Sequence, residues 1–259
     1  MDALLDTAWS FAILLAVFLP LELLFPANGR RVLHKESFTD LLFFLGQYLL
    51  WTAPVVAVLV FVHRHVDGLP LQTVRAAFAA LPLWLSLPLA ILLSDCAIYW
   101  GHRFSHSNAL LWRFHRVHHT AEKVDWLAAH REHPFDNLYT RLIENAPLIV
   151  LGVPLPALAG FAMFRGLWAI FIHSNTRLSP GPLRYLLGAP RLHHWHHARE
   201  LGGGVNYANL SPLMDLLFGT YCDPGRMPAS YGIDDPVAHG YVRQLVDPLL
   251  PRARGNRTI

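Results

Sequence analysis

The chain has 259 residues, of which 53% are hydrophobic and only 15% are charged. Soluble globular domains usually carry about 25% charged residues, so this composition, with a mean hydropathy of +0.31, indicates a membrane protein. The formal net charge of +3 comes without a lysine- and arginine-rich run or an aromatic RNA-binding motif, so no nucleic-acid partner is expected. Two separated cysteines, Cys96 and Cys222, exclude a disulfide framework and a cysteine-type zinc site.

Three apolar stretches have the length of membrane-spanning helices. They run from about residue 9 to 25, from 38 to 62 and from 80 to 100, each near the ~20 residues that cross ~30 Å of hydrocarbon. The first stretch is preceded by Asp2 and Asp6 and by no basic residue. We therefore expect a membrane helix there rather than a cleavable signal peptide.

A fourth apolar stretch, from about residue 142 to 172, contains prolines near its middle at Pro147, Pro154 and Pro156. Proline interrupts a helix because it lacks a donor and clashes with the preceding turn. Two full crossings need about 40 residues, and this stretch has fewer. We therefore predict an all-α integral-membrane helical bundle with about three transmembrane helices and a re-entrant helical hairpin.

Basic residues between the predicted helices set the expected topology. They occur after the first stretch and after the third, at Arg30, Arg31, Lys35, Arg103, Arg113, Arg116 and Lys123. The positive-inside rule places both regions in the cytoplasm and the N-terminus on the opposite face. Arg165 lies within the hairpin, where a bare charge is costly, so we expect Asp95 or Glu144 to be its partner.

Histidine is the unusual residue of this chain. Of its 16 histidines, 12 lie between His102 and His197, and most of these form three clusters: His102 and His106; His115, His118 and His119; and His193, His194, His196 and His197. The spacings i, i+3 and i+4 put imidazoles on one face of a helix. Adjacent histidines point about 100° apart and can serve different metals.

His193, His196 and His197 repeat the His-x-x-His-His spacing of the second cluster, which leaves eight ligands without His194. Eight ligands exceed the three or four that one metal usually takes from a protein, so the clusters predict a histidine-rich dimetal site in a cytosolic helical cap. Imidazole suits iron, zinc, copper and nickel. The chain has no His-Glu-x-x-His motif, which argues against the zinc metalloproteases that use this motif. It also has no paired Glu-x-x-His motif, which argues against a soluble di-iron bundle. A zinc-dependent membrane hydrolase and a metal or haem transporter remain as alternatives.

Residues 95–106 and 111–120, the third histidine cluster and the segments 206–207 and 214–220 resemble the fatty acid hydroxylase/sterol desaturase superfamily. The resemblance covers roughly residues 80–222. It implies an O2-dependent di-iron lipid hydroxylase or desaturase with two iron ions, a lipid substrate, O2 as co-substrate and an external electron donor, either a ferredoxin or a b-type cytochrome. The implied ligands are His102, His106, His115, His118, His119, His133, His173, His193, His196 and His197.

Three further residues are candidates for a supporting role in this site. We expect Asp95, which precedes His102 by seven residues, to accept a hydrogen bond from the second ring nitrogen of a ligand. Asn206 and Asp215 are candidates for the same role. The expected division is an N-terminal membrane region (1–79), a catalytic domain (80–222) and a polar C-terminal tail (223–259). The sequence names neither the lipid nor the choice between hydroxylation and desaturation.

Overall fold

A computed structural model describes residues 2–29, 33–236 and 238–251 of the chain. These residues form helices and two isolated β-bridges, with no extended sheet among them. Arg30, Arg31 and residues 252–259 of the predicted C-terminal tail lie outside the described residues. The all-α prediction is confirmed.

Four helical segments of the described chain are long and apolar enough to cross a membrane. They are α1 (Asp2–Leu24), the continuous run of α2 (Ser37–Gly46), η1 (Gln47–Trp51) and α3 (Thr52–Asp67), then α5 (Leu83–Ser107), and α8 (Leu155–His173). Only 11–22% of each span is buried inside the protein, as expected of helices that face lipid. The chain is thus a multi-pass integral membrane protein.

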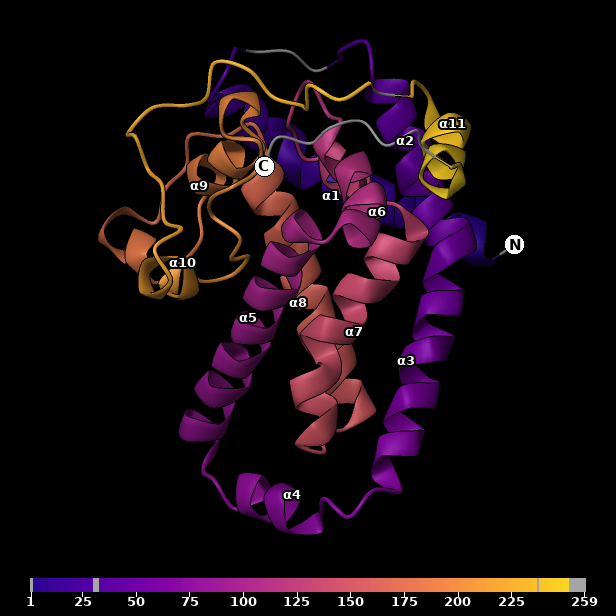
Figure 1. Ribbon diagram of the computed structural model, residues 1–259, viewed down its shortest axis with the longest axis vertical. Coiled ribbons are helices and arrows are strands. Elements are labelled where there is room, and N and C mark those ends of the chain that lie inside the picture. Colours follow the sequence, from indigo (N-terminus) through magenta and orange to yellow (C-terminus); the bar gives the residue numbers. More distant parts are fainter. Residues whose placement is uncertain (1, 30–32, 237, 252–259) are drawn as a thin grey trace.

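The long helices give the molecule an elongated shape with two different ends. Figure 1 shows α3, α5, α7 (Pro134–Val150) and α8 running lengthwise, with the short α4 (Gln72–Ala79) across the lower end. The upper end holds the short helices α6 (Ala109–His119), α9 (Pro190–His196), α10 (Leu213–Leu217) and α11 (Tyr241–Val246). All three histidine clusters lie at this upper end or on the helices that lead into it.

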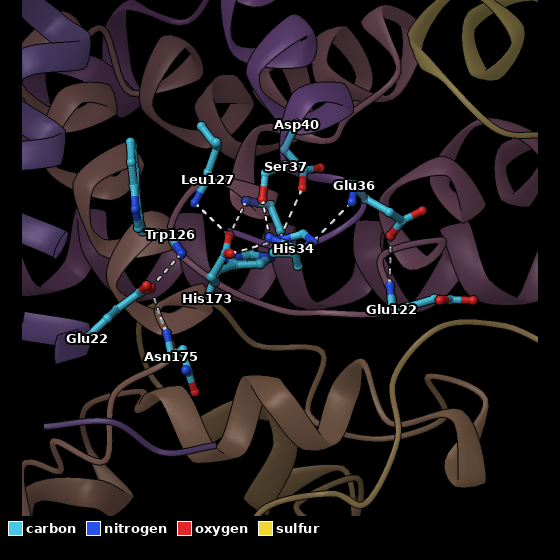
Figure 2. Close-up of polar contacts among 12 residues, drawn as sticks. Glu22, His34, Glu36, Ser37, Asp40, Glu122, Trp126, Leu127, His173 and Asn175 are labelled. Atoms are coloured by element: carbon cyan, nitrogen blue, oxygen red, sulfur yellow. Dashed lines mark hydrogen bonds and ion pairs between the residues drawn. The ribbon is translucent and has the colours of Figure 1, made fainter. Parts of the chain in front are cut away.

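The first helix lies differently from the sequence-based expectation. It has the length and composition of a membrane span, but Figure 1 shows it running crosswise to α3 and α5, with both of its ends in the upper half of the molecule. Its C-terminal turn is held by Glu22, whose carboxylate accepts the backbone N–H groups of Trp126 and Asn175 at 2.8 Å each (Figure 2). The aromatic ring of Phe11 packs on those of Phe44 and Trp126. These contacts fix α1 against the histidine end instead of leaving its N-terminus at the far end.

The predicted hairpin is present as α7 and α8, joined by residues 151–154. The chain turns at Gly152, where φ is +76°, a backbone angle that glycine adopts without steric cost. Close packing of α7 on α5 depends on Gly101, because a Cβ there would lie 2.7 Å from a methyl group of Ile143. The hydroxyl of Ser94 also donates to the carbonyl of Glu144 at 2.8 Å.

The charge in the hairpin has the partners predicted for it. Arg165 is 1% exposed and lies 2.5 Å from carboxylate oxygens of both Asp95 and Glu144. Glu144 also pairs with Arg141 at 2.7 Å. Because these ion pairs join α8 to both α5 and α7, they hold together the three helices that lead into the histidine end.

The segment after the histidine clusters folds back on the bundle. The indole of Trp51 donates to the hydroxyl of Tyr241 at 3.2 Å, and the ring of Tyr241 packs edge-on against Phe43. Asp247 forms an ion pair with Arg116 on α6. Part of the predicted polar tail is therefore packed on α2 and α6.

Removing the buried arginine tests the energetic role of the ion pairs. We expect Arg165→Leu to destabilise the protein by about 3–5 kcal/mol, because two buried carboxylates lose their counter-charge. Unfolding of the detergent-solubilised protein measures this change. The exposed Arg64 provides the control variant Arg64→Leu, which should unfold like wild type. Equal stability of all three proteins would contradict the assigned role of Arg165.

Candidate metal centre

The three histidine clusters lie on short stretches of helix that end at the same place. His102 and His106 occupy the last turns of α5, one helical turn apart. Asn108 ends this helix and caps the next one, since its side chain accepts the N–H groups of Leu110 and Leu111. The chain thus reverses and brings α6, with the second cluster, against the first.

The structure gathers nine of the ten predicted ligands into two groups. In each group, one ligand nitrogen from every member lies within 4.8 Å of the others. The five-histidine group contains His102, His106, His115, His119 and His196. The four-histidine group contains His118, His173, His193 and His197. His173, predicted from outside the three clusters, thus lies among them.

Backbone carbonyls orient four of these imidazoles through their Nδ1 atoms. His102 Nδ1 lies 2.7 Å from the carbonyl oxygen of Tyr207, and His196 Nδ1 lies 2.7 Å from that of Val205. The Nδ1 atoms of His118 and His173 face the carbonyls of Arg131 and Ala169 at 3.1 and 2.7 Å. A carbonyl only accepts, so each Nδ1 carries the proton and each Nε2 presents a lone pair.

The Nε2 atoms meet at distances that hydrogen bonding does not explain. The Nε2 atoms of His118 and His173 are 3.0 Å apart, although each is an acceptor. His102 and His115 approach to 3.0 Å, and His119 and His196 to 3.1 Å, also through Nε2. Two imidazole nitrogens bound to one ion at about 2.1 Å lie about 3.0 Å apart when about 90° separates them. The donor set therefore fits a cation in each group.

Burial keeps these imidazoles neutral, as metal ligation requires. Desolvation lowers the pKa of His115 to about 3 and that of His118 to about 4. The pKa values of His193, His196 and His197 are also lowered well below the usual value, first by desolvation and then by neighbouring groups. At neutral pH the lone pairs are therefore free to bind metal.

One loop supplies two of the orienting carbonyls, and Asn206 and Asp215 hold it in place. Asn206 has a positive φ of 53°, and its amide bonds the carbonyls of Leu192 and Cys222 at 2.8 Å each. Asp215 accepts the N–H groups of Tyr207 and Ala208 at 2.8 and 2.9 Å. Both residues therefore support His102 and His196, but through the loop backbone rather than by direct contact with a ligand.

Two supporting contacts escaped the sequence analysis. Asp136 is buried, with a carboxylate oxygen 3.0 Å from Nδ1 of His115. Arg131, whose carbonyl orients His118, is fully buried and pairs with Asp40 at 2.6 Å and Glu36 at 3.1 Å. Figure 2 shows Asp40 and Glu36 beside His34 in this part of the molecule. No spacing pattern in the sequence marks Asp136 or Arg131 for such a role.

Two predicted site residues are not members of either group. His133 lies outside both groups: it caps α7 by accepting the N–H of Phe135, and its Nε2 lies 3.1 Å from the carbonyl of Leu245. Asp95 bonds Arg165 instead of a histidine ligand, because the buried guanidinium needs a counter-charge at that depth. His194 is buried and orients the carbonyl of His173 at 3.0 Å, with its other ring nitrogen on Tyr231.

The family model of fatty acid hydroxylases matches residues 87–220, which include all nine grouped histidines. Over 175 residues the chain is 31% identical to an ornithine lipid hydroxylase of Rhizobium tropici, a match covering 67% of this chain and 53% of that protein. It is 33% identical over 150 residues to an alkylglycerol monooxygenase of Danio rerio, covering 58% of this chain and 33% of the relative.

A third relative is a sterol desaturase, the Delta(7)-sterol 5(6)-desaturase of Gibberella zeae. The identity is 28% over 144 residues, which are 56% of this chain and 38% of that protein. The chain thus spans between about a third and a half of the length of these relatives. No solved structure matches it.

Two neighbouring glycines allow a matched test of the five-histidine group. Gly203 has a φ of +73°, and a Cβ there would lie 2.5 Å from Cε1 of His106; Gly202 has a φ of +56° and open space around it. Both alanine variants carry left-handed backbone strain, but only Gly203→Ala displaces a grouped imidazole. We expect Gly203→Ala to lose metal and Gly202→Ala to retain it, as measured by metal content after purification. Equal metal content would contradict the placement of His106.

Asp215→Asn tests whether the loop matters for metal affinity. We expect the variant to bind metal about 10- to 100-fold more weakly, as is usual when a supporting contact is lost, because an amide accepts both loop N–H groups less well than a carboxylate. Chelator competition measures the affinity. Asp234→Asn is the control, since that carboxylate is 85% exposed. A loss of affinity in both variants, or in neither, would refute the role of Asp215.

Proposed function

Because the chain belongs to the fatty acid hydroxylase family, we propose that it is a membrane-bound di-iron oxygenase. It hydroxylates or desaturates a C–H bond of a lipid, using O2 and two external electrons. In the hydroxylation reaction, one oxygen atom enters the lipid and the other leaves as water with two protons. The single observation that carries the proposal is the convergence of nine imidazoles, seven of them buried, into two adjacent groups.

Two iron ions in these groups would supply the activation of O2 and the removal of hydrogen from an unreactive C–H bond. The chain itself provides ligands of fixed orientation. Carbonyls of the 205–207 loop hold His102 and His196, and Asp136 holds His115. Such positioning would hold the two ions in a fixed place relative to the substrate. Burial of the histidines also excludes water from the reaction.

The position of the two groups supports a lipid substrate. His102 and His173 lie in the last turns of two apolar helices, α5 and α8, where the membrane-facing surface meets the polar end. A lipid whose chain lies along these helices reaches the histidines without leaving the bilayer. The named relatives act on an ornithine lipid, on alkylglycerols and on sterols, which supports the class but not one substrate.

We propose that the histidine end faces the cytoplasm. Lys35, Arg103, Arg113 and Lys123 belong to the segments at this end, in agreement with the positive-inside rule. The electrons are proposed to come from a separate ferredoxin or b-type cytochrome. The chain's two cysteines cannot supply the four thiolates that an iron–sulfur cluster usually takes.

The geometry favours this function over a zinc hydrolase. Zinc sites are usually tetrahedral, and tetrahedral ligands at about 2.1 Å lie about 3.4 Å apart, whereas the Nε2 atoms here approach to 3.0–3.2 Å. Neither group contains a glutamate among the described residues, although zinc hydrolases use one as a base. A transporter would place its histidines along a path through the membrane instead of in one buried cluster.

Metal analysis and lipid profiling test the proposal together. We expect about two irons per wild-type chain, and loss of both iron and product in His118→Ala, because His118 belongs to the four-histidine group. The control is His65→Ala, since His65 is exposed on α3; it should behave like wild type. Cells that carry wild type, His118→Ala or no protein are compared by lipid mass spectrometry.

Three results would contradict the proposal. One zinc per chain would favour the hydrolase, and weakly held, exchangeable metal would favour the transporter. If wild type and His118→Ala change the lipid profile equally, relative to cells without the protein, the lipid change does not depend on the metal site.

A further inference from the structure

A second polar site lies beside α9, outside the two histidine groups. It is a cavity of about 300 Å³ whose lining includes Arg177, Arg184, Arg191, Arg226 and Asp223. Small-molecule sites usually measure about 300–1,000 Å³, so this cavity suits a compact polar group better than a whole lipid. Four arginines against one aspartate leave a surplus of three positive charges in its walls.

The arginines are available to bind an anion. Asp223 pairs with Arg191 at 2.7 Å, and among the described residues no other carboxylate lines the cavity. Arg184 donates to the hydroxyl of Tyr185, a neutral partner, at 2.9 Å. Arg226 lies over the ring of Trp195, 5.2 Å from its centre. Guanidinium groups form paired, charge-assisted hydrogen bonds with phosphates and carboxylates. An anion with several oxygens can therefore accept hydrogen bonds from the arginines of this cavity.

The cavity adjoins the metal centre. Ala189 and Leu192 line it, and the same two residues line a second, smaller cavity together with His193 and Asn206. Arg191 precedes His193 by two residues on α9, which is about 3 Å along the helix axis. A group held by the arginines therefore lies next to the helix that carries two of the grouped histidines, His193 and His196.

The surroundings of the cavity are apolar and exposed. Leu183 and Leu186 in and after η3 (Gly181–Tyr185) are each 53% exposed, and Leu217 at the end of α10 is 71% exposed. Figure 1 shows α10 at the height of the upper part of α5, where the apolar span ends. Exposed leucines beside arginines at this level match the boundary between hydrocarbon and headgroups.

We propose that this cavity holds the anionic headgroup of the lipid substrate, through a phosphate or a carboxylate. The inference rests on the proposed function, because it assigns the substrate of that enzyme to lipids with a negatively charged headgroup. The headgroup is fixed beside α9, and the chain of the same lipid extends toward the histidine groups.

Binding of defined probes tests the site without requiring turnover. The iron-loaded, full-length protein in detergent is titrated with dioctanoyl phosphatidic acid, with dioctanoyl phosphatidylcholine and with inorganic phosphate. The variant is Arg177→Gln/Arg184→Gln, and the matched control is Arg64→Gln/Arg243→Gln, which removes two exposed arginines elsewhere. We expect wild type and control to bind the phosphatidic acid at least tenfold more tightly than the other probes. The variant should lose at least tenfold in that affinity while keeping its iron.

Unchanged binding of phosphatidic acid by the variant would overturn the site. Inorganic phosphate binding as tightly as the lipid would assign the cavity to a free anion and overturn the headgroup assignment. In cells, the variant should form less lipid product at unchanged iron content; unchanged product would show that the bound lipid is not the substrate. Failure of the proposed function has a different signature, namely a wild-type protein without two irons.

Discussion

Four of the grouped imidazoles carry their proton on Nδ1, where it is bonded to a backbone carbonyl, and the rest of this structure depends on that constraint. An imidazole whose Nδ1 donates to a carbonyl presents only a lone pair at Nε2, and such lone pairs meet at 3.0 Å in the pair of His118 and His173. Without a cation that both lone pairs bind, this contact is repulsive. Metal binding and folding of the upper end are therefore linked.

The carbonyls that fix these protons come from segments with no histidine pattern of their own. The 205–207 loop contributes two of these carbonyls. Arg131 and, in α8, Ala169 contribute one carbonyl each. Residues far from the metals hold these segments in turn, such as Asp215 for the loop and Asp40 for Arg131. The centre thus extends well beyond its ligands, and its stability depends on buried ion pairs and backbone contacts.

Helical spacing allowed the sequence to predict most of the ligands, because i, i+3 and i+4 fix which imidazoles share a face. The sequence also predicted the partners of Arg165, since a buried charge requires a counter-charge. Hydropathy gave the apolar helices but not the direction of α1, because composition does not record what a helix packs on. The roles of Asp136, Asp95 and His133 depend on contacts between segments, which local spacing does not encode.

Adjacent histidines make the two groups one unit. His118 and His119 are neighbours on α6, and His196 and His197 are neighbours at the end of α9, yet each pair is divided between the groups. The rings of His119 and His197 stack across the boundary, 4.5 Å between centres. A rotation of either helix that improves one group must therefore displace a ligand of the other. Two bound metals would therefore fix the position of α6 and α9 together, which explains why one short repeated pattern, His-x-x-His-His, suffices to build a paired site.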